Sequence, residues 1–84
     1  MLKLKFTDID EFLDWVDTEN PPGERYYTTR KGESEGYTRI IAVVQSSRRR
    51  AYVIDNVKDE ETDDIYDRLA ELDFIFVEEI EGLR

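Results

Sequence analysis

The side chains of this 84-residue chain that could do chemistry are mainly carboxylates and guanidinium groups, because the sequence contains no histidine and no cysteine. Those two missing residue types supply the commonest metal ligands, the commonest general base and many catalytic nucleophiles. The four glycines are scattered and form no phosphate-binding loop. We therefore expect no catalytic residues, no metal and no cofactor, and a carboxylate-based enzyme is the least favoured function.

Acidic residues recur at helical spacing in two segments. Asp10, Asp14 and Asp17 share one side of a predicted helix, and no lysine or arginine lies between Lys5 and Arg25 to balance them. The second predicted helix carries a similar stripe, formed by Glu60, Asp64, Asp67 and Glu71. Like charges at this spacing cost about 0.2–0.5 kcal/mol for each pair. A basic protein partner would explain this penalty, and a solvated acidic surface kept for solubility is the simpler explanation.

Two large aromatic residues flank the apolar stripes of these predicted helices. Tryptophan and tyrosine are enriched in the energetically dominant parts of protein interfaces, so either ring could anchor a partner. The more usual role in a small domain is to cover the edge of the core. The predicted partner site consists of Asp10, Asp14, Asp17, Trp15 and Tyr66.

Basic residues concentrate in the middle of the chain, where tyrosines are interleaved with them. Residues 24–50 hold seven basic and three acidic side chains, whereas the whole chain has a net charge of −9. Cations and aromatic rings on a sheet could contact phosphates and stack on bases, so RNA or polyanion binding is the alternative function. The alternative site consists of Arg25, Arg39, Arg48, Arg49, Arg50 and Tyr27. A charged hairpin end that discourages edge-to-edge aggregation would explain the same residues.

The elements that must position these residues follow from hydrophobic periodicity. Alternating apolar residues predict strands, and a repeat of three or four predicts helices. The patterns predict, in order, a strand at 2–6, a helix at 8–18, strands at 25–31, 37–45 and 51–55, a helix at 60–72 and a strand at 74–79. This order indicates an α+β fold, with two helices packed on one face of a mostly antiparallel five-stranded sheet and the other face open.

Length and composition limit the protein further. A chain of 84 residues can bury one core, so we expect a single domain over residues 1–84. The longest apolar run, Ile40 to Val44, is far shorter than the ~18 residues needed to span a bilayer. Because there is also no cysteine for disulfides, we expect a soluble cytoplasmic protein that does not bind membranes. The function predicted from the charge distribution is a non-catalytic module that binds a basic protein through its acidic helices.

Repulsion between the acidic helices predicts a response to salt. Added KCl screens charges that lie farther apart than a Debye length, which is ~10 Å at 0.1 M. Raising KCl from low to moderate concentration at neutral pH should therefore raise the melting temperature measured by circular dichroism. A melting temperature that falls steadily with KCl would mean that attractive ion pairs dominate the electrostatic energy.

Overall fold

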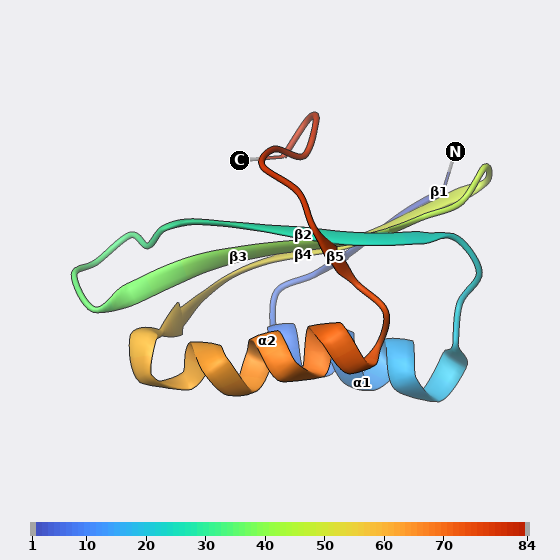
Figure 1. Ribbon diagram of the computed structural model, residues 1–84. Helices are drawn as coiled ribbons and strands as arrows, with labels where there is room; N and C mark the ends of the chain where they lie inside the picture. Colours follow the sequence, from blue (N-terminus) through green and yellow to red (C-terminus); the bar gives the residue numbers. More distant parts are fainter. Residues whose placement is uncertain (1, 84) are drawn as a thin grey trace.

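The computed structural model describes residues 2–83, which form a five-stranded sheet with two helices on one face (Figure 1). The elements are β1 (Leu2–Phe6), α1 (Ile9–Glu19), β2 (Glu24–Lys31), β3 (Tyr37–Gln45), β4 (Arg49–Lys58), a 3-10 turn (Asp59–Glu61), α2 (Thr62–Glu71) and β5 (Ile75–Phe76). The predicted α+β class, with five strands and two helices, is confirmed. Neither helix in this described range is long and apolar enough to cross a membrane.

Helix α1 begins and ends at residues that suit helix termini. The Asp8 carboxylate accepts hydrogen bonds from the N–H groups of Asp10 and Glu11, at 2.8 and 3.2 Å. A carboxylate at this position satisfies N–H groups that have no partner within the helix. Asn20 follows the last turn in the left-handed conformation, with φ 46°, and its N–H donates to the Val16 carbonyl. Asparagine tolerates this conformation better than most residues, and the prolines that follow prevent the helix from continuing.

The sheet is mixed, with the strand order β1-β4-β3-β2-β5. Strands β2, β3 and β4 form the expected antiparallel meander, whereas β1 pairs in parallel with β4, and β5 pairs in parallel with β2. The prediction of a mostly antiparallel sheet is therefore wrong. The physical reason is that each edge strand is joined to the meander through a helix, and a helical crossover returns the chain in the parallel direction.

Both helices lie on the same face because their crossovers run the same way across the sheet. Helix α1 carries the chain from β1, past β4 and β3, to β2, and α2 carries it from β4, past β3 and β2, to β5. Crossovers between parallel strands are almost always right-handed. Two right-handed crossovers that run in the same direction across a sheet therefore place their helices on the same face. The two helices also run in the same direction (Figure 1).

The last strand is shorter than predicted. Residues 74–79 were expected to form it, but only the two residues of β5 pair with β2, and the chain then turns away from the strand direction (Figure 1). Phe74 instead packs into the core between the sheet and the helices, where it is 5% exposed. An uninterrupted apolar run extends from Phe74 through Val77, so the local pattern alone did not show where pairing stops.

The C-terminal segment 77–83, which we call the tail, covers part of the sheet face that was expected to be open. Ile80 of the tail is buried against Ile41 and Val43 in a second apolar cluster. The Arg50 guanidinium holds the tail by donating to the carbonyl of Glu81 at 2.9 Å. Arg30 makes a similar bond to the carbonyl of residue 78, at 2.8 Å. An acidic segment is therefore held against a basic sheet face.

Docking of the tail predicts a large effect of truncating Ile80. The side chain is 2% exposed, and replacing a buried isoleucine with alanine costs at least about 2 kcal/mol. Ile80→Ala should therefore lower the free energy of unfolding measured in urea by that amount. Glu79→Ala, an exposed position in the same segment, is the matched control and should change it by less than about 0.5 kcal/mol. Equal, small effects of the two changes would show that the tail is not docked in solution.

Candidate functional site

The two helices present carboxylates on the side away from the sheet. Fourteen of the 21 acidic residues lie in segments 8–19 and 59–73, which contain one basic residue, Arg68. All fourteen are exposed, because the apolar stripes of the helices are turned toward the sheet. We call these acidic residues the acidic layer. It is the most highly charged surface of the described residues and the first candidate for a binding site.

Arg68 joins the two helices across the acidic layer. Its guanidinium on α2 lies 3.2 Å from a carboxylate oxygen of Asp10 and 2.7 Å from one of Asp14, both on α1. The two aspartates are 68% and 74% exposed, and ion pairs in such settings contribute only about 0.2–1 kcal/mol each. Arg68 therefore offsets part of the repulsion between the helices, and the apolar core beneath them supplies most of the stabilisation.

Position along each helix separates carboxylates that the fold uses from those that it does not. The first turns carry acidic pairs at 10–11 and 63–64, where the helix dipole stabilises negative charge by about 0.3–1 kcal/mol. Asp17 and Glu71 lie in the last turns, where the same dipole disfavours them. Within residues 2–83 neither of these two carboxylates has a hydrogen bond or an ion pair. The negative charges of Asp17 and Glu71 therefore do not stabilise the fold.

The structure places the predicted partner-site residues on three parts of the helical face. Asp10, Asp14 and Asp17 lie along one exposed side of α1, the side turned toward Arg68. The aromatic residues lie on the outer flanks. Trp15 is half-buried, with its ring 5.2 Å from that of Phe6 on β1.

Tyr66 occupies the opposite flank, beside β2. Its ring stacks on that of Tyr27, with centroids 6.1 Å apart and an interplanar angle of 26°. Burial raises the pKa of Tyr66 above the ordinary value of 10.0, the nearby Tyr27 adds to this rise, and a hydrogen bond with the Thr29 side chain opposes it. Trp15 and Tyr66 thus border the acidic layer on separate sides and do not form one aromatic patch.

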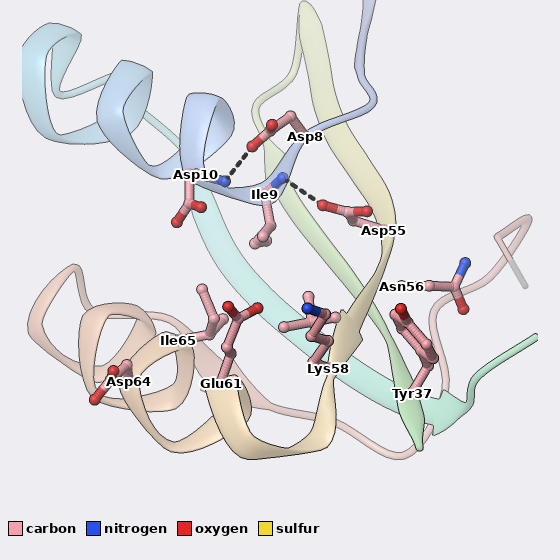
Figure 2. Close-up of a pocket in the computed structure, with 11 residues that line it drawn as sticks. Asp8, Ile9, Asp10, Tyr37, Asp55, Asn56, Lys58, Glu61, Asp64 and Ile65 are labelled. Atoms are coloured by element: carbon pink, nitrogen blue, oxygen red, sulfur yellow. Dashed lines mark hydrogen bonds between the residues drawn. The ribbon is translucent and has the colours of Figure 1, made fainter. Parts of the chain in front are cut away.

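A cleft of about 370 Å³ lies where the two helices begin (Figure 2). Its walls come from the start of α1, the end of β4 and the turn into α2. Carboxylates dominate the lining, which includes Asp8, Asp10, Asp55, Glu61 and Asp64. Lys58 is the one cation that the described part of the chain contributes to the lining. A positively charged group would therefore be attracted to this end of the acidic layer.

Two of the cleft carboxylates also cap helix α1. Besides Asp8, the Asp55 carboxylate on β4 accepts a hydrogen bond from the Ile9 N–H at 2.9 Å (Figure 2). Local sequence patterns did not indicate this role for Asp55, because its proximity to α1 depends on the pairing of β4 with β1 in the sheet. Among residues 2–83 no three histidine, cysteine or acidic side chains are grouped so that they could hold a metal ion. Two of the cleft carboxylates, Asp8 and Asp55, therefore stabilise the start of α1.

The residues of the alternative polyanion site are divided between the two faces of the sheet. Arg25 and Tyr27 lie on the helix side, where the Arg25 guanidinium donates to the carbonyl of Leu72 at 2.9 Å and Tyr27 packs against the core. Strand alternation places Arg39 and Arg50 on the opposite face. Two further members are exposed near the start of β4: Arg48 lies in the connection from β3, and Arg49 is the first residue of β4. The structure does not bring these six residues together.

The face opposite the helices contains cations that were not predicted as site residues. Lys3 and Lys5 of β1 are exposed, and Lys3 pairs in register with Arg50 of β4. The alternation of residues 2–6 already placed both lysines on one side of a strand. The parallel pairing of β1 with β4, which brings them next to the arginines, could not be read from that local pattern.

Comparisons with known proteins add no information on function. No protein-family model matches the chain, and no curated protein sequence matches it either. Because one fold can serve many functions, the fold alone does not indicate the function, and the surfaces of the molecule are the remaining evidence.

The raised pKa of Tyr66 predicts how stability changes in alkali. In the unfolded chain this hydroxyl ionises near 10.0, whereas the folded protein holds its proton to higher pH. The stabilisation is therefore complete below pH 10.0 and is lost as the pH rises through the folded pKa. Tyr66→Phe should reduce the fall in unfolding free energy between about pH 9 and pH 11. Equal pH dependence in the variant and the natural protein would contradict the proposed burial of this hydroxyl.

Proposed function

We propose that this protein is a non-catalytic interaction module of the cytoplasm that binds a basic protein partner through the acidic layer. The observation that supports this most is the position of Asp17 and Glu71. Their carboxylates lie at helix ends that disfavour negative charge, and no described residue neutralises them. Charge that costs stability in the free protein becomes favourable when lysine or arginine side chains approach it.

The acidic layer has further features that suit a basic partner. Its cleft is an acidic recess, lined by Glu61 and Asp64 among other carboxylates, that would attract a lysine or arginine side chain. Trp15 and Tyr66 are half-exposed at its borders and would add apolar contacts around the charged centre. Complementary charge mainly accelerates encounter and rejects unsuitable partners, so we expect binding that weakens as salt is added.

Binding of RNA or another polyanion has less support. Its six predicted residues lie on both faces of the sheet, and the guanidinium of Arg50 is bonded to the tail. The tail is bonded to Arg30 and Arg50 and packs on this face through Ile80. It carries three acidic residues, Glu78, Glu79 and Glu81, whose negative charge would repel phosphates.

Charge reversal on the acidic layer tests the proposed function. Asp17, Asp67 and Glu71 should be changed together to lysine, because these three carboxylates make no ion pair or hydrogen bond within residues 2–83. Asp10 and Asp14 should be left intact, since reversing them would also remove the partners of Arg68. Binding of a short lysine- and arginine-rich peptide, measured by isothermal titration calorimetry at low KCl, should fall at least about tenfold.

A second triple variant controls for net charge. Changing Glu35, Glu79 and Glu81 to lysine alters the net charge by the same amount at exposed positions outside the acidic layer. This control should retain most of the affinity for the basic peptide. Equal losses in the two variants would mean that only overall charge attracts the peptide, and the proposed binding surface would be wrong. The acidic residues would then serve solubility alone.

A further inference from the structure

The outer edge of β1 is a strand edge with free backbone groups. β1 is the first strand of the sheet, and among the strands that residues 2–83 form it pairs only with β4. The Leu2 N–H donates inward to the Arg48 carbonyl at 2.9 Å. Because inward and outward bonding alternate along a parallel strand, the N–H and C=O groups of Lys3 and Lys5 face outward. Within residues 2–83 no backbone or side-chain group bonds to them.

The side chains of this edge are apolar on one side and basic on the other. Leu2 and Leu4 are 62% and 39% exposed, and Leu4 pairs in register with Ala51 on the helix side of the sheet. Lys3 and Lys5 therefore project to the opposite side. Exposed leucines on an unpaired edge strand are unusual, because such an edge attracts another strand. This edge has the features of a docking site for an extended chain.

The charge around the edge limits which chain could pair there. Segments 2–6 and 47–52 lie together through the β1–β4 pairing and contain five basic residues and no acidic residue. A second copy of β1 fits this edge poorly. Antiparallel pairing through the outward-facing backbone groups would place Lys3 or Lys5 opposite a lysine of the other copy. Like charges directly opposite each other destabilise a sheet. An acidic segment has the complementary charge.

We propose that the β1 edge binds an extended segment of a partner protein in which acidic and apolar residues alternate. The segment would pair antiparallel with β1 and add a sixth strand to the sheet. Its acidic side chains would lie opposite Lys3 and Lys5, and its apolar side chains would cover Leu2 and Leu4. This surface is separate from the acidic layer and selects the opposite charge, so the inference does not depend on the proposed function.

The probe for this site is a peptide of alternating glutamate and valine, and a peptide with lysine in place of glutamate is its control. Nuclear magnetic resonance titration should show binding of the glutamate peptide, with the largest amide shifts at Lys3 and Lys5. The lysine peptide should leave these amides unchanged. Shifts elsewhere on the sheet, or no binding of the glutamate peptide, would overturn the proposal.

Two substitutions of Lys5 separate the backbone contribution from that of charge. Lys5→Pro removes the outward N–H and the charge, and proline is tolerated on edge strands where its nitrogen faces solvent. Lys5→Thr removes the charge and keeps the N–H. The proline variant should bind the glutamate peptide roughly tenfold more weakly than the threonine variant, because a hydrogen bond is lost and a carbonyl of the peptide is left unpaired. Equal affinities of the two variants would exclude strand addition.

A charge-swapped variant keeps the test independent of how well proline is accommodated. Lys3→Glu combined with Lys5→Glu preserves every backbone group. The amides of residues 3 and 5 in this variant should shift with the lysine peptide and stay unchanged with the glutamate peptide. Failure to switch would overturn the proposed pairing. Two other results would show that the edge has a different occupant. If the natural protein forms a dimer that Lys5→Pro dissociates, the occupant is a second copy of the chain. If single-stranded RNA shifts the same amides and binds Lys5→Pro as tightly as Lys5→Thr, the occupant is RNA.

Discussion

Two helices of like charge must lie side by side in this protein because both crossovers of the chain run in the same direction across the sheet. The apolar stripes of the helices pack on the sheet, so their carboxylates can only face water. Arg68 is the single basic residue in these helical segments, and its bonds to Asp10 and Asp14 offset only part of the repulsion. The large apolar core, which includes Phe12 and Leu69, must supply the rest of the stabilisation.

The same topology separates charge across the molecule. The helices take most of the acidic residues to one face, and strand alternation leaves lysines and arginines on the other. The tail then brings Ile80 onto that second face, where its apolar contacts and the bonds from two arginines hold an acidic segment over part of the basic surface. The β1 edge lies at the end of the strand order farthest from β5. The chain therefore presents an acidic face and, at this edge, a basic strand with free backbone groups.

Local sequence patterns predicted the elements well, because each depends on residues that are near one another in the chain. Helical spacing located α1 and α2, and strand-forming residues located the meander to within a few residues. The parallel edges of the sheet depend on contacts between distant segments, which no local pattern encodes. For the same reason the bond from Asp55 to Ile9 and the bridge made by Arg68 were not predicted. Strand alternation showed that neighbouring residues point to opposite faces of the sheet. It did not show that the helices cover the face that carries Arg25 and Tyr27.

We infer that the protein carries its acidic layer at a cost to its own stability. The most direct measurement is the free energy of unfolding of a variant in which Asp17, Asp67 and Glu71 are replaced by Asn, Asn and Gln, which removes charge and nearly preserves shape. At low salt we expect this variant to be more stable than the natural protein by about 1 kcal/mol, with the difference shrinking as KCl is added. A variant less stable than the natural protein would show that these carboxylates support the fold, which is the opposite of a stability cost.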